Sequence, residues 1–310
     1  SSLLDAGHNN FVTALSGSRA LEAINAAEIP FDILLLDIDM PGMNGIELCE
    51  KIKTLSEYKA APIIMITAME DRHFIDGAFA AGAMDYVSKP FDPIELGVRI
   101  SLATRVLTQS RQIESSKSEV EYLKMRSGIS TNLDSSEAMD INEIPRVVGM
   151  TAMENYLLRL TSGMARQSQS MAFSIDGFDM LHANMSYVEI YDILADTADA
   201  IATGLKRVKH LITYCGSGVF VAVCHKSSIM QDSSLLPEIQ NTIDSFGLCF
   251  VKGRPFTLKL QQSKSYTPNV WAAFSGLNLL NEPIKSLPKE QLAPLSGKKS
   301  SQFRLHEDSI

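Results

Sequence analysis

The sequence predicts two domains, an α/β domain with a parallel sheet and an α+β domain with an antiparallel sheet, joined by a long connector helix. Short β-rich runs alternate with helical patterns over residues 11–100, the order that produces parallel sheets with crossover helices. One helical pattern then continues from Pro93 to about Gly128 without a strong breaker. A strand, a helix and a hairpin follow beyond residue 144. The length of 310 residues agrees, since domains usually have roughly 100 to 200 residues.

Four strands and three helices are expected in the first domain. The strands are predicted at residues 11–15, 32–37, 62–67 and 85–88, and the helices at residues 18–27, 45–56 and 71–82. The two middle strands are continuously apolar, which is typical of strands covered on both faces. This domain is placed at residues 1–105.

The connector, residues 106–143, combines a helix with an acidic linker. A heptad pattern places apolar residues at the a and d positions, with two polar interruptions at Gln109 and Ser116. Its apolar members are Leu102, Val106, Ile113, Val120 and Leu123. This weak seam predicts a homodimer. Residues 127–143 contain no Lys or Arg, and we expect them to form a flexible linker.

The second domain is placed at residues 144–280. Residues 171–175 form the expected first strand, and residues 210–214 and 219–224 form the hairpin around two glycines. Between them, apolar residues recur at three- and four-residue steps from Ile190 to Leu205, as in an amphipathic helix. Three prolines beyond residue 280 argue against regular structure, so residues 281–310 are expected to be an extended tail.

Composition excludes several classes of protein. The net charge is −8 and no basic cluster stands out, which argues against nucleic-acid binding. No apolar run reaches the roughly 18 residues of a membrane span, and no secretory signal is present, so a cytoplasmic location is expected. The four cysteines and six histidines show no metal-ligand spacing.

Three polar residues follow or end the strands of the first domain. Asp37 ends one apolar strand, Thr67 ends the next, and Lys89 follows the last. The carboxyl ends of parallel strands meet at one edge of the sheet, where such folds bind their ligands. A carboxylate nucleophile with a hydroxyl and an ammonium group suits phosphoryl transfer to the carboxylate.

The segments around these residues resemble the response-regulator receiver family. They are Leu-Leu-Leu-Asp37-Ile-Asp-Met-Pro-Gly, Met-Ile-Thr67-Ala, and Asp-Tyr86-Val-Ser-Lys89-Pro. The resemblance covers about residues 3–105 and implies a flavodoxin-like fold, a cis Lys89–Pro90 bond, and a sensor histidine kinase or phosphotransfer protein as partner. It implies that Asp37 is the phosphoacceptor, that Thr67 and Tyr86 are switch residues, and that Lys89 senses the phosphate.

The same resemblance implies Mg²⁺, held by the Asp37 carboxylate and the backbone carbonyl of Asp39. The family completes this metal site with an acidic pair at the end of a first strand, whereas this sequence starts within the helix that follows it. We therefore expect the metal site to need residues upstream of Ser1, and a truncated or unresolved N-terminus. The missing strand would lie inside the sheet, so we expect the gap to be closed by rearranged strands or by another chain.

The second domain resembles the GGDEF family, whose members make cyclic di-GMP from GTP. The resemblance rests on residues 173–178 and 214–223, at the spacing of that family. Residues without carboxylates stand at the metal-binding and signature positions, namely Ser174, Gly216, Ser217, Gly218 and Val219. Asp176 survives, but a lone Asp on a strand is usually structural. Comparison with class III nucleotide cyclases also places Ser174 and Ser217 at the metal positions.

These features predict a response regulator with a degenerate GGDEF-like output domain that acts through dimerisation or a downstream protein partner. Two-metal nucleotidyl transfer requires carboxylates, and His182 and Tyr191 also replace the usual base-contacting residues. The alternatives are an active diguanylate or nucleotide cyclase with relocated metal ligands, and a sensor that binds GTP or cyclic di-GMP without turnover. A Mg²⁺-dependent turnover assay distinguishes an active cyclase from a non-catalytic domain. Calorimetry detects a sensor that binds the nucleotide without turnover.

Overall fold

The computed structural model describes the greater part of both domains. The described residues are 10–69, 71–127, 139, 141, 144–226, 233–248, 256–268 and 275–288. The side chains of residues 113–127 and of Asn184 lie outside the description. The predicted acidic linker and most of the predicted tail also fall largely outside the described residues.

The first domain has a three-stranded parallel sheet of order β1-β2-β3, as its strand pattern predicted. Leu36 pairs with Met65, and Thr67 pairs with Ser88, which aligns the carboxyl ends of the strands. The strands are β1 (Leu34–Leu36), β2 (Ile63–Thr67) and β3 (Asp85–Ser88). The helices are α2 (Gly17–Ala26), α3 (Gly45–Lys53) and α4 (Arg72–Ala80), with a 3₁₀ turn at Ser56–Tyr58.

The strand predicted at residues 11–15 is wrong, because this segment has no regular secondary structure and Leu15 is 95% exposed. A strand is stable only beside a partner strand, and β1 pairs only with β2 among the described residues. No rearranged strand covers the other edge of β1 among the described residues. Closure of this edge by a second chain stays a prediction.

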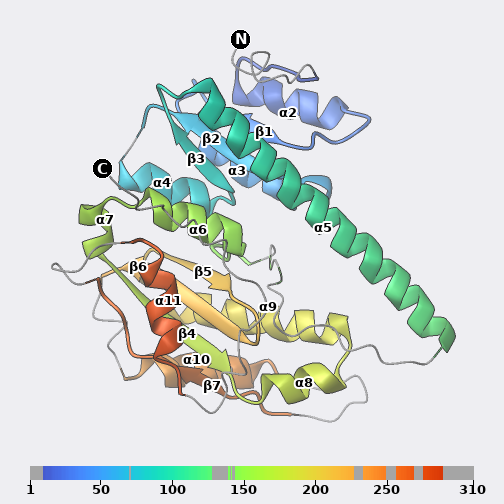
Figure 1. Ribbon diagram of the computed structural model, residues 1–310, viewed down its shortest axis with the longest axis vertical. Coiled ribbons are helices and arrows are strands. Elements are labelled where there is room, and N and C mark those ends of the chain that lie inside the picture. The colour runs from blue at the N-terminus through green and yellow to red at the C-terminus, as the bar shows by residue number, and fades with distance from the viewer. Residues whose placement is uncertain are drawn as a thin grey trace, which may run out of the picture.

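Helix α5 (Pro93–Ser127) begins on the parallel sheet and continues well past it, as Figure 1 shows. Its buried face packs against Ile64 and Val87 of the sheet. This face consists of Leu96, Ile100 and Ala103, and Leu107 further along the helix is also buried. Val106, predicted to lie in the dimer seam, packs instead on the edge of this core, whereas Leu102 is largely exposed.

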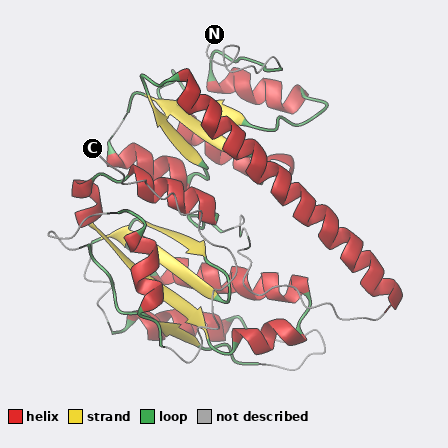
Figure 2. Ribbon diagram, in the orientation of Figure 1, coloured by secondary structure: helices red, strands yellow, loops and turns green. Residues whose placement is uncertain are grey.

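The second domain has a four-stranded antiparallel sheet of order β5-β6-β4-β7. The strands are β4 (Ser168–Ile175), β5 (His210–Tyr214), β6 (Val219–His225) and β7 (Leu260–Gln262). Helices flank the sheet (Figure 2). The buried cluster on one face includes α8 (Phe178–Asn184), α9 (Tyr187–Gly204) and α10 (Leu235–Ser245), and the cluster on the other includes α6 (Met150–Arg159), α7 (Ser162–Arg166) and α11 (Asn278–Lys285).

Helix α11 contradicts the prediction that regular structure stops at residue 280. It continues to Lys285 and includes Pro283, which lacks the N–H for one helical hydrogen bond. Leu279, Leu280 and Pro283 are all buried in the core. Burial of this apolar face favours the helix more than the missing hydrogen bond disfavours it.

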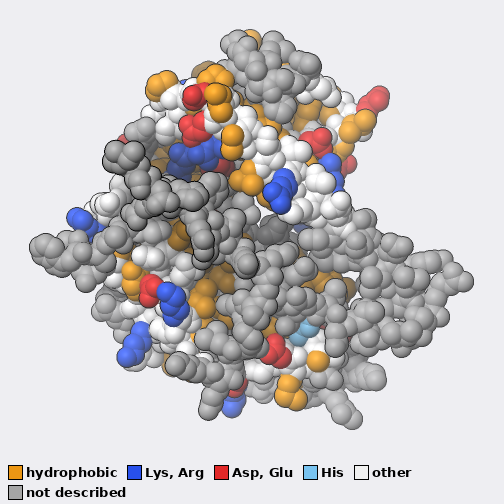
Figure 3. Space-filling view, viewed as in Figure 1, with side chains coloured by type: hydrophobic (Ala, Val, Ile, Leu, Met, Phe, Trp, Pro, Cys, Tyr) orange, Lys and Arg blue, Asp and Glu red, His pale blue; other side chains and the backbone are white. Residues whose placement is uncertain are grey.

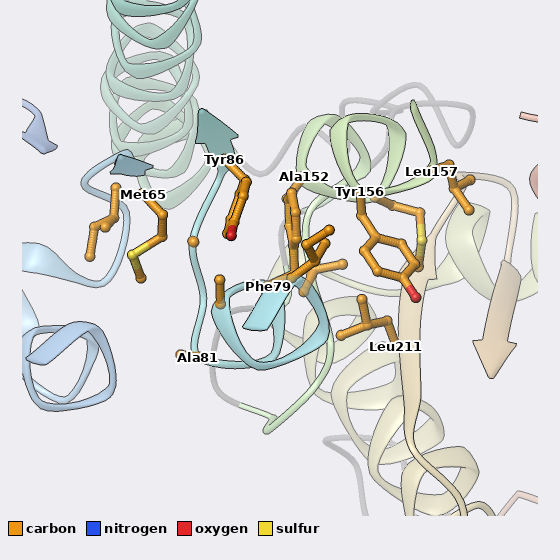
Figure 4. Close-up of a cluster of buried hydrophobic side chains, with 14 of the residues drawn as sticks. Met65, Phe79, Ala81, Tyr86, Ala152, Tyr156, Leu157 and Leu211 are labelled. Atoms are coloured by element: carbon orange, nitrogen blue, oxygen red, sulfur yellow. The ribbon is translucent and has the colours of Figure 1, made fainter. Parts of the chain in front are cut away.

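A single apolar cluster joins the two domains. Phe79 and Tyr86 of the first domain and Ala152 and Tyr156 of α6 all belong to it. Figure 4 shows these side chains between the sheets of the two domains, with Leu211 of β5 on the far side. Helix α6 therefore lies between the two sheets.

Candidate functional site

Asp37 and Lys89 meet at the carboxyl edge of the parallel sheet. Asp37 directly follows β1, whose Leu34 and Leu36 are buried, and Lys89 directly follows β3. The Lys89 ammonium donates a hydrogen bond to Asp37 Oδ2 and forms an ion pair with it. The two side chains remain 41% and 32% exposed, so a phosphoryl donor can approach from solvent.

The loop after Asp37 fixes the position of its carboxylate. The backbone N–H of Asp39 donates to Asp37 Oδ1 at 3.2 Å, and Gly45 donates to the carbonyl of Ile38 at 3.1 Å. A Cβ atom on Gly45 would lie 2.2 Å from the carbonyl oxygen of Asp37, so only glycine fits at this position. Asn44 then caps α3, because its side chain accepts from the N–H of Glu47 at 2.9 Å.

Thr67 lies at the same edge and is fully buried. Its carbonyl accepts a hydrogen bond from the N–H of Lys89 at 2.7 Å, and its hydroxyl accepts from the N–H of Met69 at 3.2 Å. The structure thus places Asp37, Thr67 and Lys89 together, as their positions after the strands predicted. The Lys89–Pro90 peptide bond is cis, which confirms that expectation.

Tyr86 lies on β3, three residues before Lys89, but its side chain is buried between the domains rather than at the sheet edge. Its backbone N–H donates to the carboxylate of Asp85 at 2.7 Å. That carboxylate also pairs with Arg99 of α5. Burial alone would lower the pKa of Arg99, but the Asp85 and Glu95 carboxylates outweigh it and raise the pKa.

Receiver domains generally bind Mg²⁺ at the phosphorylation site. Among the described residues, no group of three or more His, Cys, Asp or Glu side chains could hold a metal ion. Mg²⁺ prefers six oxygen ligands, and the Asp37 carboxylate with the Asp39 carbonyl supplies few of them. The described residues therefore do not complete a metal site by themselves.

The residues predicted to stand at the cyclase metal and signature positions lie around the tip of the hairpin. Ser174 lies in β4 opposite Val219 and is buried. The turn between β5 and β6 contains three consecutive residues with positive φ: Gly216 at 90°, Ser217 at 50° and Gly218 at 72°. Gly218 donates its N–H to the Tyr214 hydroxyl at 3.1 Å. No carboxylate stands at these positions.

Phe178 closes the hairpin tip. A Cβ atom on Gly218 would lie 2.6 Å from its ring, and the Gly218 carbonyl accepts from Ile175 N–H at 2.9 Å. Asp176 is exposed, and its backbone N–H donates to the Lys259 carbonyl at 2.8 Å. A tip closed by a phenyl ring is a poor cradle for a triphosphate.

A polar cluster that no sequence pattern predicted joins the two domains. Asp76 of α4 accepts a hydrogen bond from the Tyr156 hydroxyl at 2.9 Å and contacts His225 Nε2 at 2.7 Å. Arg72, one helical turn earlier, lies 3.6 Å from the same carboxylate. Residues so far apart in the sequence carry no local pattern that could have revealed these contacts.

Comparisons with known proteins place the first domain in a family. Residues 1–101 match the response regulator receiver domain. The chain is 36% identical over 111 residues to the transcriptional regulatory protein YvrH of Bacillus subtilis, covering 36% of this chain and 45% of YvrH. It is 37% identical over 116 residues to the response regulator PleD of Caulobacter vibrioides, covering 36% of this chain and 25% of PleD.

A longer match extends over 186 residues of the probable transcriptional regulator ycf27 of Cyanidium caldarium, with 31% identity. It covers 58% of this chain and 71% of ycf27. The chain spans less than half of YvrH and PleD. No helix among the described residues is long and apolar enough to cross a membrane. The chain belongs to the response regulators and carries their receiver domain at residues 1–101.

Proposed function

We propose that this response regulator is phosphorylated on Asp37 and that its second domain is a non-catalytic, GGDEF-like output module. The observation that carries the first part is the contact between Asp37 and Lys89 at the carboxyl edge of the sheet, beside Thr67. The proposed phosphoryl donors are a sensor histidine kinase or a phosphotransfer protein. The proposed location is the cytoplasm.

The chemistry assigned to these residues is nucleophilic. A carboxylate oxygen of Asp37 attacks phosphorus, an acyl phosphate bond forms, and the bond from phosphorus to the donor breaks. Lys89 moves from the carboxylate to a phosphoryl oxygen, because the transferred group carries more negative charge. Thr67 carries the hydroxyl of this site, and we assign it the role of hydrogen-bond donor to the phosphoryl group on Asp37.

Labelling with acetyl phosphate tests the role of Asp37. The assay is run with Mg²⁺ on the full-length protein, because the described residues do not complete a metal site by themselves. We expect the wild-type protein to be labelled and Asp37→Asn to be unlabelled. Asp39→Asn is the matched control and should remain labelled, since only its backbone is assigned to the site. Equal labelling of wild type and Asp37→Asn would refute the assignment.

The second part of the proposal rests on the hairpin tip. Ser174 and Gly216–Gly218 supply no carboxylate, and Phe178 fills the space above Gly218. The protein should therefore form no cyclic di-GMP from GTP and no cyclic AMP from ATP, with either Mg²⁺ or Mn²⁺. Product formation that is abolished by Asp176→Asn would establish an active cyclase instead. Calorimetric binding of GTP or cyclic di-GMP without turnover would establish a nucleotide sensor.

The proposed output is dimerisation or contact with a downstream protein partner. Helix α5 carries an exposed apolar stripe at Ile94, Val98 and Leu102, which recur at four-residue steps. This stripe lies away from the buried face of α5. Figure 3 shows that exposed hydrophobic side chains form small groups on the visible face of the protein. The stripe supports a second copy of the chain as the partner of α5.

A further inference from the structure

Helix α6 belongs structurally to the second domain. Just before it, Val148 donates to the Ile212 carbonyl at 2.8 Å, and Ile212 donates to the Arg146 carbonyl at 2.9 Å. A Cβ atom on Gly276 would lie 1.9 Å from the carbonyl oxygen of Leu157, so the α6 backbone is in close contact with this segment. Met153 and Leu157 are fully buried. These contacts attach α6 firmly to the antiparallel sheet.

The contacts of α6 with the receiver are different, because polar groups form much of them. The Asn155 side chain donates to the Met84 carbonyl at 2.9 Å, and the Tyr156 hydroxyl donates to Asp76 at 2.9 Å. Arg159 lies 3.6 Å from Glu95 of α5. Interfaces of this mixed character between domains usually permit relative motion. A separation of the domains would therefore occur between α6 and the receiver.

Asp76 is the centre of the polar contacts. Its carboxylate is 12% exposed and meets Tyr156 of α6, His225 of β6 and Arg72 of its own helix. Arg72 in turn donates to the Met164 carbonyl at 2.7 Å and to the Ser168 hydroxyl at 2.8 Å. Asp76 and Arg72 together thus contact four elements of the second domain, namely α6, α7, β4 and β6. Loss of its charge would leave the guanidinium of Arg72 poorly compensated in a largely buried position.

The docked position covers Tyr86 and Phe79. Both side chains are fully buried, and Ala152 and Tyr156 lie over them (Figure 4). The ring centroids of Phe79 and Tyr156 are 5.4 Å apart in an edge-on arrangement. An open arrangement would expose these aromatic side chains to solvent. The polar contacts around Asp76 therefore act together with this apolar contact.

We propose that Asp76 is the centre of an intramolecular latch that holds the second domain, through α6, over the Tyr86 face of the receiver, and that the latch opens without unfolding of either domain. Strand β3 carries Tyr86 under α6 and leads directly into Lys89 on Asp37. A change at Asp37 thus has a short covalent route to the latched face. This link to phosphorylation rests on the proposed function, whereas the latch itself does not.

A thiol introduced by Ala152→Cys reports on the latch. Position 152 is 8% exposed and faces the receiver, so alkylation there requires α6 to move away. The native Cys49 is fully buried in the receiver core and reports on unfolding in the same sample. Peptide mass spectrometry measures both alkylation rates. The full chain is used, without any phosphoryl donor.

We expect Asp76→Asn to increase the alkylation rate at position 152 by about tenfold or more, the effect of losing one charge-assisted hydrogen bond. Tyr156→Phe, which removes only one hydroxyl, should give a smaller increase. Asp71→Asn makes the same change of charge on an exposed residue directly before α4 and should have no effect.

An unchanged rate at position 152 in both Asp76→Asn and Tyr156→Phe would overturn the latch. Equal acceleration at position 152 and at Cys49 would also overturn it, because the domains would then unfold together. The unphosphorylated protein suffices for this experiment. A failure to label Asp37 would therefore leave the latch standing, and a failure of the latch would leave the assignment of Asp37 standing.

Discussion

Lys89 and Asp37 form an ion pair although 52 residues separate them in the sequence. Both side chains are about one-third exposed or more, so solvent screens the pair and it contributes only about 0 to 1 kcal/mol to stability. Its position at the carboxyl edge of the sheet therefore points to a role in chemistry rather than in folding.

Lys89→Gln should separate these two roles. We expect the free energy of unfolding to change by less than about 1 kcal/mol, because the lost pair is exposed. The variant should still be labelled at Asp37 but should lose any conformational response to the phosphoryl group. Urea unfolding and alkylation at position 152 measure the two effects. Lys51→Gln, an exposed residue of α3, is the control and should change neither.

Gly45→Ala should destabilise the receiver by about 2 kcal/mol or more, because the added methyl group cannot avoid the backbone of Asp37. The matched control is Gly77→Ala in α4, where a Cβ atom meets only the flexible end of Ile46 at 3.1 Å. That change should stay within about 1 kcal/mol, since alanine favours a helix interior. Equal losses of unfolding free energy in the two variants, measured by urea unfolding, would contradict the close contact between Gly45 and the backbone of Asp37.

The positions of Asp37, Thr67 and Lys89 could be predicted from the sequence because they depend on a local rule. Each apolar run identifies a strand, and parallel strands place their carboxyl ends together. The strand expected at residues 11–15 failed because a strand also depends on its neighbour in the sheet, which a local pattern cannot reveal. Helix α11 was not predicted because Pro283 argues against a helix. The burial of Leu279, Leu280 and Pro283 that favours this helix is known only from the folded structure.

The contacts between the domains could not be predicted for the same reason. Asp76 and His225 lie 149 residues apart, and neither stands in a recognisable motif. The apolar seam of α5 could be predicted only in part from the sequence. The heptad spacing identified an apolar helix face, but only the structure shows that Val106 packs on the receiver core.

Replacement of Ile94, Val98 and Leu102 by Ser should therefore weaken a dimer without loss of receiver stability, because these side chains are exposed. Val106→Ser should instead lower the free energy of unfolding, since this side chain packs on the core. Sedimentation velocity over a range of concentrations measures the dimer. An unchanged sedimentation coefficient in the triple variant would exclude this face of α5.

Burial lowers the pKa of His210, and the nearby Arg146 adds to this effect, although hydrogen bonds to the Val208 and Leu205 carbonyls oppose it. The unfolded chain therefore takes up a proton on this residue at a higher pH than the folded protein does. Stability from this residue is complete above a pH of about 6.5 and should fall as the pH is lowered below that value. His210→Gln should reduce the slope of unfolding free energy against pH. An identical slope in the wild type and the variant would show that His210 does not contribute to the pH dependence of stability.

The carboxylates of the GGDEF signature should be difficult to introduce into this domain, because position 218 does not tolerate an Asp side chain. An Asp at this position would require a side chain on a residue with φ of 72°, and its Cβ atom would lie 2.6 Å from the Phe178 ring. We expect Gly218→Asp to destabilise the second domain by about 2 kcal/mol or more, because both the backbone and the packing oppose it. A variant with only Ser174→Asp and Val219→Glu would lack the third carboxylate of the proposed site, the one at position 218. Phe178→Ala should itself be destabilising because this side chain is buried, but the double variant with Gly218→Asp should be more stable than the sum of the two single changes predicts, because the smaller side chain removes the clash. Thermal unfolding of the single and double variants tests this coupling. If the double variant is less stable than the sum of the single changes predicts, Phe178 does not close the hairpin tip.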